Sequence, residues 1–118
     1  MPADFLQKHV AAVAASDLDA VAALYADDAT LVSFEWTADG ADAVRQRFSD
    51  FFDFHGEISE VEVVYDRATD DAAFAMYAVT GERGTFRIVN AFVLDGDVCS
   101  RHFSNEVGAD LDRDEVDG

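Results

Sequence analysis

The amino-acid sequence predicts a single α+β domain in which three helices pack on one face of a strongly curved antiparallel sheet. Up to residue 55, apolar residues recur at helical spacing, whereas from residue 60 onward they alternate as in strands. Turn signals at Glu82-Arg83-Gly84 and Asp95-Gly96 join the later strands as hairpins. With 118 residues, the chain is long enough to bury one core and does not need a second.

The first helix is predicted over residues 4–15. Phe5, His9 and Val13 lie on one line of it, with Leu6 and Val10 beside them. This line is the stripe of an amphipathic helix, and His9 lies within it.

A second helix is expected to start at Ser16, whose hydroxyl can cap it while Asp19 stands three residues later, as in a capping box. Asp27 and Asp28 are expected to end this helix, and a short strand follows near residues 30–35. The buried face of the helix is formed by Leu18, Val21, Ala22 and Tyr25.

The third helix is predicted from a cap at Asp39 to a stop at Gly56. Its apolar residues recur at i, i+4, i+7 and i+8, which gives a wide aromatic face. They are Val44, Phe48, Phe51 and Phe52.

The second half of the chain is predicted to form strands. Residues 60–65 alternate with one solvent-facing side, residues 72–80 have no polar side, and the last strand is expected at about 98–105. Three helices can cover only one face of the strands at 72–80 and 85–94. We therefore expect a second subunit on the other face, which makes the protein a homodimer.

The formal charge of -17 and the presence of Lys8 as the only lysine indicate an acidic surface over the whole molecule. Such self-repulsion is screened at high salt, so the composition favours adaptation to a salty cytoplasm over an acidic patch that docks on a basic partner. Nucleic acid is excluded as a partner because eight dispersed cations do not form a basic stripe.

The single cysteine, Cys99, indicates a core residue and no intrachain disulfide. The N-terminus has no basic start followed by an apolar run, and no stretch is long enough to span a membrane, so we expect a cytoplasmic protein. No zinc spacing or glycine-rich phosphate loop is present, and we expect no cofactor or metal. The domain is expected over residues 1–107, followed by an acidic disordered tail over 108–118.

Asn90 is the sharpest anomaly of the sequence, because it is the one amide on an otherwise apolar strand face. Its neighbours on that face are Phe86, Ile88, Phe92 and Leu94. Burying an amide without partners costs ~1–3 kcal/mol. Asn90 is therefore either a core amide bonded to a neighbouring strand or water, or a donor that points into a pocket.

The histidines are candidates for proton transfer, since the ordinary pKa of histidine is near neutral. His9 lies on the apolar face of the first helix, where it is either a packed core residue or a catalytic one. His102 alternates with Ser100 and Ser104 on the last strand, which is either a solvated edge face or a pocket lining. His55 follows the third helix and is expected to be a solvated cation at the helix end.

Tyr25 and Tyr77 are expected on buried faces, with hydroxyl groups that reach a partner. Trp36, flanked by Glu35 and Thr37, could close the mouth of a pocket or fold onto the third helix.

The segment from Asp17 to Leu31, with the pattern D-x-x-A-x-x-x-L-Y-A-D-D-A-T-L, resembles the SnoaL-like and ketosteroid-isomerase-like domains of the nuclear-transport-factor-2-like superfamily. The resemblance extends more loosely from the first helix to about Val107. It implies a cone in which a curved sheet wraps three helices, a pocket at the open end of the cone, and a homodimer through the outer face of the sheet.

Ketosteroid isomerase uses an Asp base, with a Tyr and a protonated Asp as oxyanion donors. By this resemblance the base falls at Ser33, the tyrosine at His9 and the donor acid at Asn90, so all three residue types differ. This makes steroid isomerisation doubtful, although His9 and Asn90 can both donate hydrogen bonds.

The sequence thus predicts a dimer that binds a compact organic molecule in an apolar pocket and, if it is an enzyme, acts as an isomerase, cyclase or lyase without a cofactor. His9 or His102 would move a proton while Asn90 holds an oxyanion. The alternative is a ligand-binding or assembly module of the same fold. The candidate substrate-binding residues are Tyr25, Ser33, Glu35, Trp36, Tyr77, Phe92 and Ser104.

Overall fold

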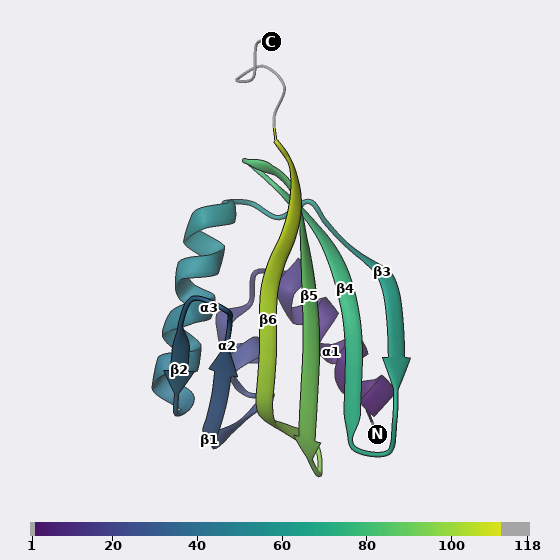
Figure 1. Cartoon of the computed structure of the whole chain (residues 1–118). Coiled ribbons are helices and arrows are strands. Elements are labelled where there is room, and N and C mark those ends of the chain that lie inside the picture. The colour runs from purple at the N-terminus through teal and green to yellow at the C-terminus, as the bar shows by residue number, and fades with distance from the viewer. Residues whose placement is uncertain (1, 112–118) are drawn as a thin grey trace.

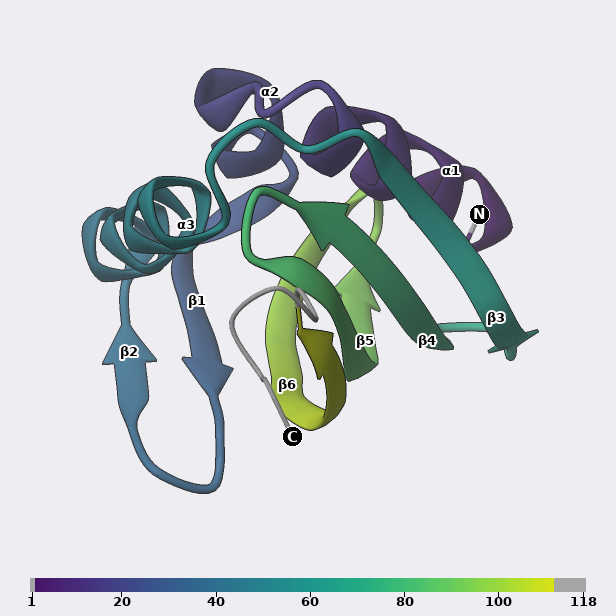
Figure 2. The same cartoon turned by 90° about the horizontal axis from the view of Figure 1, so that it is seen from above.

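The computed structural model describes residues 2–111 of the chain. It has the predicted α+β architecture, with helices on one face of a curved six-stranded sheet that does not close into a barrel (Figures 1 and 2). The helices are α1 (Pro2–Ala14), α2 (Leu18–Ala22) and α3 (Ala41–His55). The strands are β1 (Tyr25–Val32), β2 (Thr37–Asp39), β3 (Glu60–Ala68), β4 (Ala72–Gly81), β5 (Gly84–Asp95) and β6 (Val98–Leu111).

The strand order is β2-β1-β6-β5-β4-β3, and every pairing is antiparallel except that of β1 with β6. The predicted curved sheet is therefore confirmed, and its one parallel pairing is a feature that the sequence did not indicate. The chain leaves β1, forms β2 and α3, runs through the meander, and returns alongside β1 in the same direction (Figure 1). This parallel pairing sets Tyr25 opposite Cys99 and Leu31 opposite His102.

The second helix is shorter than predicted, because the chain enters the sheet before a second turn can form. Ser16 has a positive φ of 53°, and the N-cap is Asp17, whose carboxylate accepts a hydrogen bond from the Ala20 amide at 3.1 Å. The Cys99 amide then donates to the Leu24 carbonyl, and Tyr25 begins β1. Tyr25 is therefore a strand residue and not the end of a helical stripe.

Two further boundaries differ from the prediction. Asp39 belongs to β2. The N-cap of α3 is Gly40, which has no side chain that could cap the helix. Strand β6 continues to Leu111, so Gly108, Ala109 and Asp110 pair with β5 where the acidic tail was expected to begin. The rest of that expected tail, residues 112–118, lies outside the described residues.

The core lies between the helices and the sheet. Helix α1 packs against β3 and β4, and α3 packs against β1 and β2, as the view along the sheet shows (Figure 2). The inner face of β5 buries Phe86, Ile88, Asn90, Phe92 and Leu94, as their alternation predicted. Cys99 is fully buried with them. Within residues 2–111, no helix is both long and apolar enough to cross a membrane.

The face of the sheet away from the helices carries exposed apolar side chains. Phe74 is 46% exposed and Val93 is 42% exposed, on β4 and β5 respectively. A groove on this face is lined by residues that include Phe74, Met76, Val89 and Phe103. This is the surface for which the sequence predicted a second subunit.

Candidate functional site

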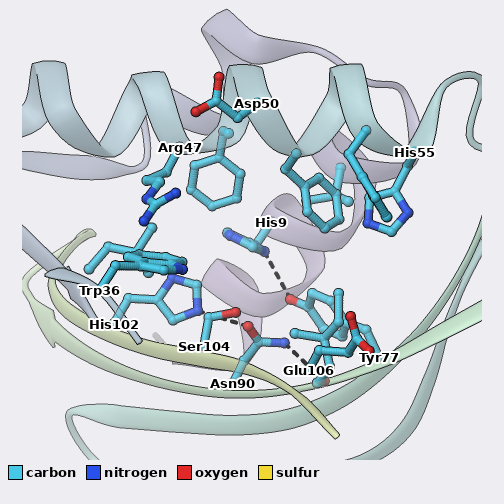
Figure 3. Close-up of a pocket in the computed structure, with 16 residues that line it drawn as sticks. His9, Trp36, Arg47, Asp50, His55, Tyr77, Asn90, His102, Ser104 and Glu106 are labelled. Atoms are coloured by element: carbon cyan, nitrogen blue, oxygen red, sulfur yellow. Dashed lines mark hydrogen bonds between the residues drawn. The ribbon is translucent and has the colours of Figure 1, made fainter. Parts of the chain in front are cut away.

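A cavity of about 260 Å³ lies between α3 and the inner face of the sheet (Figure 3). Residues of α1, α3, β1, β4, β5 and β6 line it, together with Trp36 from the connection between β1 and β2. Its walls are mainly aromatic and aliphatic, and the polar groups converge from the sheet and from α1. This combination is typical of a site for a small organic molecule.

One wall of the cavity is backed by a continuous line of buried hydrogen bonds, which we call the polar network. It consists of Tyr77, His9, Tyr25, His102 and Asn90. Tyr77 Oη lies 2.9 Å from His9 Nδ1, and His9 Nε2 lies 2.9 Å from Tyr25 Oη. Tyr25 Oη lies 2.8 Å from His102 Nδ1, and His102 Nε2 lies 2.8 Å from Asn90 Oδ1. Four separate elements, α1, β1, β4 and β6, thereby meet on β5.

The position of each proton in the network follows from its Asn90 end. The Asn90 amide nitrogen donates to the Ile88 carbonyl at 3.4 Å, so the amide oxygen faces His102 and must accept a hydrogen bond from His102 Nε2–H. A neutral His102 then accepts at Nδ1 from the Tyr25 hydroxyl. Tyr25 has no second proton, so its oxygen accepts from His9 Nε2–H, and His9 Nδ1 accepts from the Tyr77 hydroxyl. Every hydrogen bond thus points the same way, from Tyr77 to Asn90.

Both imidazoles of the network are neutral at neutral pH. Burial lowers the pKa of His9 from 6.5 to about 3. Burial, and then the proximity of His9, lowers the pKa of His102 well below its ordinary value. Burial likewise raises the pKa of both tyrosines, for Tyr25 with smaller contributions from Cys99 and Tyr77. The network therefore holds no net charge at rest.

Aromatic packing keeps water away from the network. The Phe92 ring stacks on His102 with centroids 4.1 Å apart and meets His9 edge-on at 4.8 Å. Phe48 meets His9 edge-on from the α3 side at 5.8 Å. This dry packing is the physical cause of the lowered imidazole pKa values.

Charged side chains also line the cavity. The Arg47 guanidinium carbon lies 3.6 Å from the centroid of the Trp36 ring, and both residues line the cavity. Asp50, one turn further along α3, and Glu106, beside Tyr77, are also among the residues that line the cavity (Figure 3).

His55 is buried, which contradicts its interpretation as a solvated cation at a helix end. Its side chain is 4% exposed and packs against Phe51 and Phe86, with centroids 4.2 and 4.9 Å away. Burial, and then the charge of Arg83, lowers its pKa to about 4. Its Nδ1 is the one buried side-chain polar atom without a hydrogen-bond partner in the described part of the chain.

The cavity brings together six of the ten candidate site residues from the sequence: His9, Trp36, Tyr77, Asn90, His102 and Ser104. Tyr25 does not line the cavity. Its hydroxyl group is hydrogen-bonded to His9 and His102, which do. Phe92 is fully buried beneath the network and supports it.

Ser33 and Glu35 do not line the cavity, so their assignment to substrate binding is not supported by their positions. Ser33 Oγ donates to Asn105 Oδ1 at 2.6 Å, and Glu35 is exposed in the connection that follows β1. The position at which the family resemblance placed a catalytic base is therefore occupied by a hydroxyl group that bonds to a neighbouring strand.

Sequence reasoning did not identify Arg47, His55 or Glu106 as cavity residues. A signal for two of them was present. Arg47 precedes Phe48 at the edge of the aromatic face of α3, and His55 follows Phe51 by one helical turn. Within residues 2–111, no three His, Cys, Asp or Glu side chains cluster closely enough to hold a metal ion.

The fold and the cavity define a cone-shaped α+β domain of the kind that encloses small molecules. The chain belongs to the family of the SnoaL-like domain, whose model matches residues 6–102. No relative was found among the curated proteins.

Solved structures show the same fold at low sequence identity. A candidate ketosteroid isomerase from Kribbella flavida is 14% identical, with a TM-score of 0.77 over 98% of this chain and 86% of its own. A candidate polyketide cyclase from Sinorhizobium meliloti is 17% identical, with a TM-score of 0.73 over 86% and 93%. A candidate hydroxylase from Streptomyces galilaeus is 17% identical, with a TM-score of 0.76 over 90% and 74%.

Proposed function

We propose that this protein binds a compact organic molecule in the cavity and catalyses a proton transfer on it, as an isomerase, cyclase or lyase. The observation that carries this proposal is the polar network, which connects a cavity-lining hydroxyl, that of Tyr77, to two buried imidazoles in an unbroken line. A structural core rarely needs so many polar groups, because each must be fully partnered to avoid a desolvation cost of ~1–3 kcal/mol.

The geometry supports Tyr77 as the group that meets the substrate. All four ring nitrogens of His9 and His102 are engaged in hydrogen bonds, so neither imidazole presents a free lone pair to the cavity. Tyr77 lines the cavity, and among the described residues its oxygen accepts no hydrogen bond. It can therefore accept a proton from a substrate while its own proton moves to His9 Nδ1.

The remaining transfers follow the direction of the network. His9 passes its Nε2 proton to Tyr25, and Tyr25 passes its proton to His102 Nδ1, so that the positive charge comes to rest on His102. The Nε2–H of His102 stays bonded to Asn90. The reverse route returns a proton to a different atom of the substrate, which completes an isomerisation.

Asn90 has a second amide N–H that is not used in the network, and Asn90 lines the cavity. We assign this N–H to the substrate oxygen on which negative charge develops. Because burial holds the imidazole pKa values low, a proton moves onto the network only when a substrate anion forms beside it. Trp36 and Ser104 are assigned to substrate binding at the cavity walls.

The experiment that tests this function is deuterium exchange at the carbon next to the carbonyl group in small cyclic ketones and keto acids. We expect the wild type to accelerate exchange for at least one compound and Tyr77→Phe to lose a factor of about 10² or more of that rate. Tyr65→Phe is the matched control, because Tyr65 is 70% exposed and lies outside the cavity. An unchanged rate in Tyr77→Phe would contradict the proposed route.

The competing function is a ligand-binding module without catalysis. It is favoured by the complete pairing of the network, which leaves neither imidazole exposed to a ligand. The same panel separates the two functions. Compounds that bind to the wild type without exchanging deuterium would identify the protein as a binding module.

We also propose a homodimer through the outer face of the sheet and adaptation to a salty cytoplasm. The first is supported by the exposed side chains of Phe74 and Val93, and the second by the charge of -17. Light scattering in molar salt tests the dimer, and a monomer mass at all micromolar concentrations would overturn it.

A further inference from the structure

Arg47 lies over the aromatic ring of Trp36, and both residues line the cavity. Its guanidinium carbon lies 3.6 Å from the centroid of Trp36, and the side chain is directed toward the cavity (Figure 3). A stacked guanidinium has its planar faces covered or solvated, whereas its N–H groups remain free along the edge. This edge is a preorganised fork of donors.

Arg47 has no carboxylate partner within residues 2–111, although the chain has 25 acidic residues. Arg45 on the same helix pairs with Asp19, and Arg87 pairs with Asp110. Asp50 also lines the cavity but forms no ion pair with Arg47, and its carboxylate accepts a hydrogen bond from Gln46 at 2.9 Å. Several other cations of the described residues also form no ion pair, but Arg47 is the one arginine or lysine among the residues that line the cavity.

The two ends of the cavity differ in charge. Arg47 and Trp36 form one end, and Glu106 lies at the other end beside Tyr77 (Figure 3). Between them, Phe48 and Ile88 contribute apolar surface, and Asn90 and Ser104 contribute polar groups. A ligand with one anionic group is therefore oriented with that group toward Arg47 and its other end toward the Tyr77 oxygen.

We propose that the substrate is a small organic carboxylate, and that Arg47 binds its carboxylate group through the edge of the guanidinium. Such pairs are bidentate and charge-assisted, which makes them among the stronger polar contacts in proteins. This inference deepens the proposed function and rests on it, because it assumes that the cavity holds the reacting molecule.

Binding of a panel of small aliphatic and aromatic carboxylates, benzoate among them, tests the inference when each acid is compared with its primary amide. We expect the wild type to bind at least one acid ten times or more tightly than its amide, measured by calorimetry in molar sodium chloride. Arg47→Met keeps a side chain over Trp36 but removes the charge, and it should abolish that preference. Arg47→Lys should keep part of it.

Arg45→Gln is the matched control, since Arg45 lies on the same helix but pairs with Asp19 on the surface. It should keep the full preference for the acid, and melting curves of all variants show whether the fold is intact. Equal binding of acids and amides by the wild type would overturn this inference and leave the proposed function standing. A preference retained by Arg47→Met would also overturn it. If neither series binds to the wild type, this inference and the proposed function fail together.

Discussion

Tyr25 is the residue on which the polar network depends most, because its single hydroxyl group serves both histidines. Tyr25→Phe leaves His9 Nε2–H without an acceptor and His102 Nδ1 without a donor, whereas Tyr77→Phe leaves only His9 Nδ1 unpaired. Each orphaned buried group costs ~1–3 kcal/mol. We therefore expect Tyr25→Phe to lower the free energy of unfolding about twice as much as Tyr77→Phe, measured by denaturant titration at fixed salt.

The control for this comparison is again Tyr65→Phe, because Tyr65 is 70% exposed. Its free energy of unfolding should stay within about 0.5 kcal/mol of the wild-type value. Equal losses in Tyr25→Phe and Tyr77→Phe would show that the hydroxyl of Tyr25 does not bridge the two rings.

The buried histidines make stability depend on pH in the acidic range. The pKa is lowered from 6.5 to about 3 for His9 and to about 4 for His55. Below pH 6.5 the unfolded chain therefore binds protons that the folded chain does not. The stability that comes from keeping these histidines neutral is fully present above pH 6.5. It is lost as the pH falls toward the pKa values that the histidines have in the folded protein.

His55→Leu isolates this effect from the titration of the many carboxylates. The variant removes a group that must stay neutral in the fold, together with its unpaired Nδ1. At pH 7.5 its free energy of unfolding should equal or exceed that of the wild type. From pH 6.5 to 4 the difference should widen in favour of the variant by up to about 1.4 kcal/mol per pH unit. Parallel pH dependences of the two proteins would exclude a lowered pKa at His55.

The sequence predicts the interior positions of His9 and Asn90, because each stands on an apolar face of fixed period. It does not predict which groups they contact. The bond between Tyr25 and His102 joins residues 77 positions apart and follows from the parallel pairing of β1 with β6. Spacing along one helix or strand contains no information on that pairing.

His55 shows a different limit of sequence reasoning. It continues the stripe of Val44, Phe48 and Phe51 at the next helical turn, so periodicity alone would have predicted its burial. The prediction that His55 is a solvated cation was wrong because it assumed that the imidazole is charged. A histidine can be buried without a partner charge because it loses its proton at moderate cost.

The connection between α3 and β3 depends on Gly56. It has φ 67° and ψ −146°, a backbone conformation that is essentially restricted to glycine. A Cβ atom there would also overlap the carboxyl group of Glu82, which accepts a hydrogen bond from the Glu57 amide at 2.9 Å. Gly56→Ala therefore both strains the backbone and displaces a helix-end contact.

Gly96→Ala is the matched variant, because Gly96 has φ 66° but open space where its Cβ would lie. We expect Gly96→Ala to lower the free energy of unfolding by about 1–2 kcal/mol, the cost of a left-handed conformation. Gly56→Ala should lower it by clearly more, as thermal and denaturant unfolding would both record. A smaller loss at Gly56 than at Gly96 would contradict the close approach of Glu82.

The elements themselves are predicted well where a long period is present and poorly where two elements meet. Helices α1 and α3 and the three strands from β4 to β6 follow from apolar periods and hairpin turns. The start of β1 does not, because Tyr25 fits the helical stripe and the strand face equally. The Leu24 carbonyl bonds to β6, and this tertiary contact decides between them.

At the level of the whole molecule, charge repulsion adds to the terms that oppose the fold. Within residues 2–111, the ion pairs are Arg45–Asp19 and Arg87–Asp110, whereas the chain carries a net charge of -17. The Debye length falls from about 10 Å at 0.1 M salt to about 3 Å at 1 M. We therefore expect the melting temperature to rise steeply between dilute buffer and molar sodium chloride.

Replacing Asp27 and Asp28 together by Asn gives an internal control for the effect of salt. Both are adjacent, exposed acids in β1. The double variant should melt higher than the wild type in dilute buffer and approach it at molar salt, where repulsion is already screened. A melting temperature that does not change with salt would remove salt adaptation as the reason for the composition.

The common direction of the hydrogen bonds in the polar network has an electrical consequence. The four bonds that join its members are aligned and form a dipole along one wall of the cavity. A second ordering with every proton shifted would reverse this dipole without moving any ring. Only the Asn90 end opposes that reversal, because the amide oxygen would then face the Ile88 carbonyl oxygen. The orientation of the Asn90 amide group therefore determines the direction of the electric field inside the cavity, and it does so without changing the shape of the cavity.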